Sequence, residues 1–294
     1  MKVLYLDCGM GAAGDMLSAA LLELLPKEEQ ESFVEELNGL GIPNVSFRAD
    51  PAVRCGICGT HMTVLVNGVQ EGAHDHEHSH DHEHDHDHEH SHGHEHSHDH
   101  EHSHDHEHSH DHGDGHDHKH GHSHSNMDGI RHILKDHMQL PEEIRNEVLE
   151  VYKLIADAES RAHGVPVEEI HFHEVGSMDA VADVTAVCML MHKIHPDKVI
   201  ASPVNTGCGF VRCAHGLMPV PAPATAFLLE GIPVYDNGIQ SELCTPTGAA
   251  LLRHFADTFG RKPVMCIEKI GYGMGNKDFE AANCVRAMLG ELYV

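Results

Sequence analysis

Basic residues are scarce in this chain, which has 19 Lys and Arg against 47 Asp and Glu and a formal net charge of −28 with histidine neutral. This charge disfavours nucleic-acid binding, because affinity for a polyphosphate backbone depends on Lys and Arg contacts. Aromatic residues make up only 4% of the chain, and no basic patch with interleaved aromatic residues is visible. Nucleic acid is therefore not an expected partner.

Long apolar runs are missing as well. No run approaches the roughly 18 residues that a membrane-spanning helix needs, so we expect no membrane partner. Residues 2–6 are typical of a short strand and are too few for the apolar region of a signal peptide. The nine cysteines are scattered and odd in number, which argues against a disulfide framework and favours reduced thiols in the cytoplasm.

Histidine is the residue in excess, with 35 in the chain. Every even position from His74 to His112 is histidine, interleaved with Asp, Glu and Ser, and five more alternate from His116 to His124. Because this segment has almost nothing apolar to bury, we expect residues 72–126 to be a disordered insert. Imidazole is a common ligand for borderline divalent metals, and carboxylates add charge and oxygen ligands. The tract is predicted to bind such a metal through His74, His76, His78, His80, His82, His84, His86, His88, His90 and their successors.

Strand and helix patterns alternate on both sides of the tract. Strands are predicted at residues 3–6, 45–54, 59–66, 198–202, 210–213, 232–235, 267–275 and 284–289. Helices are predicted at residues 16–25, 27–40, 128–138, 141–163, 178–193, 224–229 and 249–259. This order predicts an α/β fold with a mixed sheet and flanking helices, interrupted by the His/Asp/Glu-rich insert. The expected parts are residues 1–71, the insert at 72–126, and the remainder of the α/β body at 127–294.

A glycine-rich loop follows the first strand. Gly9, Gly11 and Gly14 fit the G-x-G-x-x-G spacing, but the next segment is helical where a dinucleotide-binding fold needs a strand. Asp7 and Asp15 bracket the loop, which indicates a metal-bound phosphate more readily than a bare pyrophosphate. The alternative is that the glycines serve only close packing.

The densest cluster of metal-competent residues outside the tract begins at His171. His171, His173 and Glu174 precede a predicted helix that carries Asp179 and Asp183 four residues apart, on one face. The alternative is an exposed polar face with one structural histidine. A further group, Cys55-x-x-Cys58-x-x-His61, lacks a clear fourth ligand and fits a turn with two thiols equally well.

These motifs together resemble one known family. They occur in order from residue 1 to about 290, around the His-rich insert. The set resembles the LarC family of nickel insertion proteins, and its motifs are Asp7-x-x-x-Gly11-x-x-Gly14-Asp15-Met16, His171-Phe172-His173-Glu174-Val175-Gly176, His215-Gly216 with Pro219-Val220-Pro221-Ala222-Pro223, Glu242-Leu243 with Thr245-Pro246-Thr247-Gly248, and Gly271-Tyr272-Gly273.

The resemblance implies an enzyme, a nickel chelatase of the lyase class. It would insert Ni(II) into pyridinium-3,5-bisthiocarboxylic acid mononucleotide and so make the cofactor of lactate racemase. CTP with Mg or Mn is implied as well, and the resemblance links it to a C-terminal domain that this chain does not contain. The expected catalytic residues are His171, His173, Glu174, Asp179 and Asp183, with His171 and His173 also as metal ligands. The expected cofactor-binding residues are Asp7, Gly11, Gly14, Asp15, His215, Thr245 and Thr247.

Two other functions remain open from the sequence. One is a nickel or zinc store, or metallochaperone, without enzymatic activity. The other is a metal-dependent hydrolase that uses His171, His173 and Asp179. The expected partners are the thiocarboxylated nucleotide, a separate C-terminal domain or subunit, and apo lactate racemase. The oligomeric state, including a homo-oligomer, is open, and insertion activity is expected to depend on the C-terminal domain.

Overall fold

A mixed β-sheet forms the centre of the fold, as the sequence predicted. The computed structural model describes residues 1–70, 126–172, 175–213 and 215–293, and these belong to one compact unit. The predicted His-rich insert lies outside the described residues. The strand order is β10-β5-β1-β12-β11-β3-β2, with β4 paired to β3. The strands of this sheet are β1 (Lys2–Asp7), β2 (Val45–Arg54), β3 (Ile57–Val66), β4 (Val69–Gln70), β5 (Lys198–Ala201), β10 (Thr258–Phe259), β11 (Met265–Met274) and β12 (Cys284–Leu292).

Strand β1 lies inside the sheet, between β5 and β12. Its residues Val3, Leu4, Tyr5 and Leu6 are all buried, which is typical of a strand covered on both faces. It pairs parallel to β5 and antiparallel to β12. Strands β11 and β12 form an antiparallel hairpin, and β2 and β3 form another. Two small sheets complete the strands, β6 (Val204–Asn205) with β9 (Val234–Tyr235), and β7 (Phe210–Cys213) with β8 (Gly216–Pro219).

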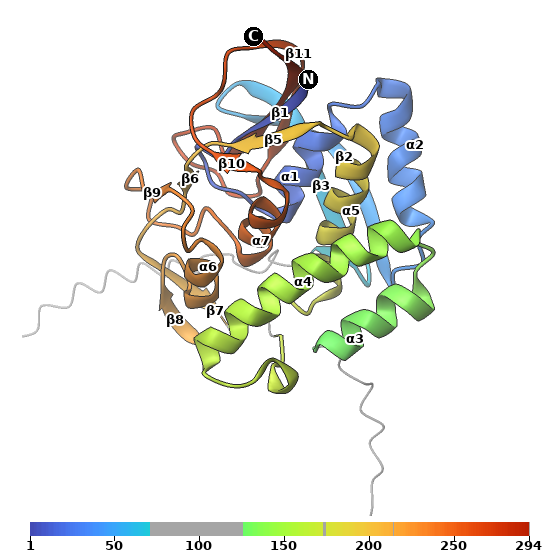
Figure 1. The fold of residues 1–294 in the computed structure, drawn as a ribbon, viewed down its shortest axis with the longest axis vertical. Coiled ribbons are helices and arrows are strands. Elements are labelled where there is room, and N and C mark those ends of the chain that lie inside the picture. The colour runs from blue at the N-terminus through green and yellow to red at the C-terminus, as the bar shows by residue number, and fades with distance from the viewer. Residues whose placement is uncertain (71–125, 173–174, 214, 294) are drawn as a thin grey trace, which may run out of the picture. The chain divides into compact units, whose positions relative to one another are not determined.

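The helices stack outward from one face of the sheet. Helix α1 packs on β11, β3 and β12, α5 packs on α1, and α4 packs on α5, α6 and α7. Figure 1 shows α4 crossing these helices on the side away from the sheet. None of the helices in the described ranges is both long enough and apolar enough to cross a membrane. The helices are α1 (Gly14–Leu22), α2 (Lys27–Asn38), α3 (Met127–His132), α4 (Glu142–His163), α5 (Met178–Ile194), α6 (Pro223–Leu228) and α7 (Pro246–Phe255), with a 3-10 turn at Val167–Glu169.

Two helix predictions need correction. The helix expected at 128–138 is α3 followed by a π-helical turn, Ile133–His137. The helix expected at 249–259 begins earlier, because Thr245 caps it and Pro246 occupies its first position. It also ends earlier, because the backbone N–H of Asp257 donates to the carbonyl of Val199 at 3.0 Å. That bond draws the next two residues into β10, beside β5.

Two glycines of β11 allow α1 to lie directly on the sheet. A Cβ at Gly273 would stand 1.8 Å from the carbonyl oxygen of Met16, and one at Gly271 would stand 2.0 Å from that of Ala20. Both oxygens belong to the α1 backbone, which cannot move aside as a side chain can. The Gly271-x-Gly273 pair is therefore a packing requirement of the helix–sheet contact.

We expect Gly273→Ala to lower the free energy of unfolding by about 1–3 kcal/mol, the usual cost of forcing an extra methyl group into a packed contact. Urea unfolding followed by circular dichroism measures this change. Gly260→Ala is the matched control, because a Cβ there meets nothing within 4 Å. Equal stability of the two variants would contradict the packing role of Gly273.

Candidate functional site

A cavity of about 240 Å³ lies at the N-terminal end of α1, where several segments of the chain meet. These segments are the start of α1, strands β3 and β4, the first turns of α5, the residues that lead into α7, and the β11–β12 loop, residues 275–283. We call it the acidic cavity after the four carboxyl-bearing residues in its lining, Asp15, Asp179, Asp183 and Glu242.

The glycine loop is held in place by the segment before α7. Gly11 has φ +88°, and a Cβ there would stand 1.9 Å from the carbonyl oxygen of Leu243. The N–H of Ala12 donates to that oxygen at 3.0 Å, and the N–H of Thr245 donates to the carbonyl of Ala12 at 3.0 Å. The close approach of two backbones explains the glycine and brings Thr245 to the start of α1.

Asp183 on α5 is the most constrained of the four acids. Asp183 is 7% exposed, and its Oδ1 atom is buried without a hydrogen-bond partner among the described residues. Burial raises its pKa well above the ordinary value, and the charges of Asp179 and Asp15 raise it further. A hydrogen bond from the backbone N–H of Asp15 opposes this shift in pKa. The carboxyl of Asp183 thus lies at the N-terminus of α1, where the sequence predicted a phosphate.

Gly14 makes this contact possible. A Cβ at Gly14 would stand 2.6 Å from both Cβ and Oδ2 of Asp183. Because Gly14 has no side chain, the carboxyl of Asp183 on α5 can contact the first turn of α1. A phosphate bound at this turn would have to share the position with Asp183.

Asp15 carries a raised pKa for the same primary reason. Burial raises it, while the nearby charge of His61 and the backbone N–H of Met16, which donates to Oδ1 at 2.8 Å, lower it. His61 lies on β3, and its Nδ1–H donates to the carbonyl of Met274 at 2.8 Å. Sequence analysis grouped His61 with two cysteines. The structure instead places it where its charge acts on the acidic cavity.

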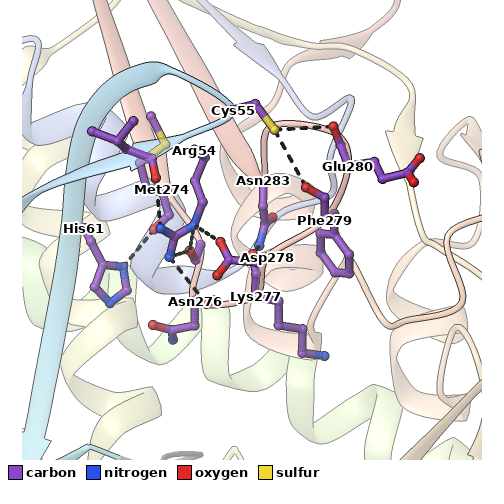
Figure 2. A network of polar contacts seen from close by, with 12 residues as sticks. Arg54, Cys55, His61, Met274, Asn276, Lys277, Asp278, Phe279, Glu280 and Asn283 are labelled. Atoms are coloured by element: carbon purple, nitrogen blue, oxygen red, sulfur yellow. Dashed lines mark hydrogen bonds and ion pairs between the residues drawn. The ribbon is translucent and has the colours of Figure 1, made fainter.

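The β11–β12 loop is fastened to the β2–β3 hairpin, as Figure 2 shows. Nη2 of Arg54 donates to the carbonyl of Gly275 at 2.9 Å, and its Nε lies 3.2 Å from the carboxylate of Asp278. The thiol of Cys55 donates to the carbonyl of Glu280 at 3.3 Å. Cys55 and Gly56 form the two-residue turn of the hairpin, both with positive φ, as a type I′ turn requires. Cys55 therefore holds a loop, and its thiol is not part of a disulfide.

This loop brings a positive charge to the acidic cavity. Lys277 is in the lining together with Asn276, Phe279 and Asn283. Its Nζ donates to Oγ of Ser241 at 3.0 Å, and its carbonyl accepts a hydrogen bond from Asn283 at 2.8 Å. Sequence analysis missed all four residues, since a polar loop after a strand carries no motif. The only signal was its position between the last two predicted strands.

The other residues predicted to bind a cofactor do not lie together in the structure. Thr245 and Thr247 line the acidic cavity, with their hydroxyl oxygens 3.3 Å apart. Asp7 forms an ion pair with Arg286 and accepts the N–H of Gly9 at 3.2 Å. His215 lines a different cavity, beside His163.

The expected His171 cluster is only partly described. His171 is exposed, and neither cavity includes it among its described lining residues. Its neighbour Phe172 is buried against Tyr152, whose hydroxyl donates to the carbonyl of Val175 at 3.1 Å. His173, Glu174 and the predicted tract ligands His74 to His90 lie outside the described residues.

The acidic cavity offers oxygen ligands to a cation. Within the described ranges, no three His, Cys, Asp or Glu side chains already surround one point as they would in a filled metal site. A divalent cation would nevertheless satisfy Oδ1 of Asp183 and remove the repulsion between the buried carboxyls. Because carboxyl ligands must be ionised, such binding would release protons from groups whose pKa is raised.

We expect Asp183→Asn to change the pH dependence of stability. A raised folded-state pKa means that the folded chain holds this proton more tightly than the unfolded chain. The resulting stabilisation is complete below about pH 3.9, the ordinary Asp pKa, and is lost as the pH rises through the folded-state pKa. Asn cannot ionise, so the variant does not lose stability in this way as the pH rises. Between the two pKa values, its free energy of unfolding relative to that of wild type should therefore increase by up to about 1.4 kcal/mol per pH unit.

Urea unfolding between pH 5 and pH 8 with a chelator present tests this expectation. Asp128→Asn is the matched control, because the Asp128 side chain is 88% exposed. A difference from wild type that stays constant with pH for Asp183→Asn would contradict the assignment of a buried, proton-retaining carboxyl.

Comparison with known proteins covers nearly the whole chain. The family model described as "Nickel insertion protein" matches residues 4–293. A relative from Geobacillus kaustophilus is 34% identical over 99% of this chain and 60% of its own length. Relatives from Clostridium kluyveri and Clostridium acetobutylicum are 37% and 38% identical over 99% of this chain, and over 62% and 64% of their own lengths. All three relatives are named pyridinium-3,5-bisthiocarboxylic acid mononucleotide nickel insertion protein.

No solved structure matches the chain. The chain spans about three fifths of the length of the curated relatives that it matches. The family match runs through the glycine loop, the Asp179–Asp183 helix and the β11–β12 loop that together enclose the acidic cavity. This chain therefore belongs to the nickel insertion protein family.

Proposed function

We propose that this chain binds Ni(II) and inserts it into pyridinium-3,5-bisthiocarboxylic acid mononucleotide. The observation that carries the proposal is the family match over residues 4–293, joined to a cavity whose most buried acid has an unpartnered oxygen. The relatives' names supply the substrate, and the cavity supplies ligands for the cation. In this proposal nickel is cargo, and the acidic cavity is where it meets the nucleotide.

The ligand chemistry of the cavity suits a transfer. Carboxylate oxygens are hard ligands, whereas the thiocarboxylate groups of the substrate are softer and suit Ni(II) better. Asp179 and Asp183 would hold the ion as it arrives, and the sulfur atoms would then take it over. Removing the ion lets Asp183 regain its proton, because burial raises its pKa. Both steps favour release of nickel toward the substrate.

Lys277 and the two threonines would position the nucleotide. A phosphate oxygen accepts a charge-assisted hydrogen bond from an ammonium group, and hydroxyl groups add neutral ones. Lys277, Thr245 and Thr247 line the same cavity as the acids. Gly14 and Asp15 are in the same lining, and Gly11 packs the glycine loop against Leu243. His171, His173 and Glu174 remain proposed participants in the transfer.

The whole activity is proposed to need more than this chain. The relatives are longer than the part matched here, and we assign the use of CTP with Mg or Mn to that additional length. Apo lactate racemase is the proposed recipient of the product. The direct test mixes this chain, with and without a separately produced C-terminal domain, with the thiocarboxylated nucleotide, Ni(II) and CTP. Activation of apo lactate racemase is the readout, and no activation in any combination would overturn the proposal.

In that assay we expect Asp179→Asn and Asp183→Asn each to lower the rate of activation at least about tenfold. A lost charged ligand is equivalent to about 1.5–3 kcal/mol. Total bound nickel, measured by equilibrium dialysis, should change little, because the 25 histidines of the tract are intact. Asp128→Asn is the control. Full activation by both variants would rule out nickel handling by these carboxyls.

Lys277→Gln tests the nucleotide side of the cavity separately. We expect the KM for the nucleotide to rise about tenfold or more, since a charge-assisted hydrogen bond is equivalent to about 1.5–3 kcal/mol. The nickel concentration for half-maximal activation should stay near the wild-type value. Lys262→Gln is the matched control, because Lys262 is not in the described lining of the acidic cavity and its Nζ donates to the sulfur of Met288. An unchanged KM would remove Lys277 from the proposed phosphate contact.

A further inference from the structure

A second cavity, of about 200 Å³, lies at the C-terminal end of α4. Its described lining includes Glu159, His163, Cys213, His215 and Met218. Figure 1 shows the β7–β8 hairpin, which carries Cys213 and flanks His215, beside this end of α4. We call it the histidine cavity. Of the described side chains, it gathers two imidazoles, the carboxyl groups of Glu159 and Glu242, a thiol and a thioether.

The local sequence explains this gathering. Glu159 and His163 are four residues apart in the last turns of α4, so they share one face of the helix. Gly164, with φ +67°, ends the helix immediately afterwards and turns the chain away. On the opposite side, Cys213 and His215 are two residues apart at the tip of a tight hairpin. The C-terminal end of α4 and the β7–β8 hairpin thus each contribute two metal-competent side chains to the histidine cavity.

The distances fit ligands of one cation. Nε2 of His163 lies 3.4 Å from Oε2 of Glu159. Two ligand atoms bound at about 2.1 Å from a metal lie about 3.0 Å apart in an octahedral site and about 3.4 Å apart in a tetrahedral one. The rings of His163 and His215 have centroids 4.7 Å apart, tilted by 48°. Two neutral imidazoles with a carboxylate are a preferred ligand set of borderline divalent cations.

We propose that Glu159, His163 and His215 bind a borderline divalent cation of the Ni(II) class. Among the described residues no three ligands already surround one point, so binding turns the His215 side chain toward His163. His215 is exposed, which permits this rotation. The site is separate from the tract and from the carboxyls of the acidic cavity.

The histidine cavity has a direct relation to the acidic cavity. Glu242 lines both cavities. This residue therefore lies between a cation held by His163 and His215 and the cavity that contains Asp179 and Asp183. We assign to the histidine cavity the role of binding nickel before the ion moves to the acidic cavity, which we call the holding role. This role rests on the proposed function, whereas metal binding at the site does not.

Metal binding is tested by thermal unfolding of the full chain with and without NiCl₂. A ligand that binds the folded state raises Tm, and the rise grows with its affinity. We compare wild type with His163→Ala and His215→Ala. His192→Ala is the control, because that histidine is half-exposed on α5, away from this cavity. All four chains keep the tract, so its contribution is common to them.

We expect His163→Ala and His215→Ala each to lose at least half of the nickel-induced rise in Tm, while His192→Ala keeps it. His215 is exposed, so its replacement should leave the metal-free Tm unchanged and keep the test valid if His163→Ala unfolds. An equal rise in wild type and His215→Ala overturns the site.

The holding role is tested by activation of apo lactate racemase in the complete mixture, with the thiocarboxylated nucleotide, CTP and the separately produced C-terminal domain, at free Ni(II) concentrations fixed by a metal buffer. We expect His163→Ala and His215→Ala to raise the Ni(II) concentration for half-maximal activation several-fold. A raised KM for the nucleotide with an unchanged nickel requirement would instead place His215 in the nucleotide site and overturn the holding role. If wild type gives no activation, the proposed function fails, while the Tm result still decides the metal site.

Discussion

The close approach of α1 to its neighbours is the constraint on which the rest of the structure depends. Gly271 and Gly273 let the helix backbone touch β11, and Gly14 lets the carboxyl of Asp183 reach its first turn. A Cβ at any of these three glycines would collide with the group that it contacts. Together they fix the N-terminus of α1 between the sheet and α5, and the acidic cavity forms at that point. The packing of the core and the chemistry of the site therefore have the same origin.

The electrostatics of the two cavities differ in kind. In the acidic cavity, burial raises the pKa of Asp15 and Asp183, and the charges of Asp179 and Asp15 raise that of Asp183 further. In the histidine cavity the ligands include imidazoles, which bind borderline metals as neutral groups. A cation would meet nitrogen ligands in one cavity and mainly oxygen ligands in the other.

Much of the fold could be predicted from local patterns. The alternation of strands and helices indicated a mixed sheet, and Asp179 and Asp183 were placed on one helix face from their spacing alone. The β11–β12 loop escaped prediction because Lys277 and Phe279 owe their position to long-range bonds from Arg54 and Cys55. His163 escaped for the same reason, since its partner His215 lies on a distant hairpin. Spacing along a chain reports on local geometry, and these contacts are set only when the sheet and the helices come together.

The hydrogen bonds that hold the β11–β12 loop mostly end on its main chain. From the β2–β3 hairpin, Arg54 and Cys55 donate to the carbonyls of Gly275 and Glu280, and Arg54 also pairs with the side chain of Asp278. Anchoring of this kind is largely independent of which side chains the loop carries. The side chains at Lys277 and Phe279 can therefore be exchanged without breaking the bonds from the hairpin, so this loop is a suitable place to alter what the acidic cavity accepts.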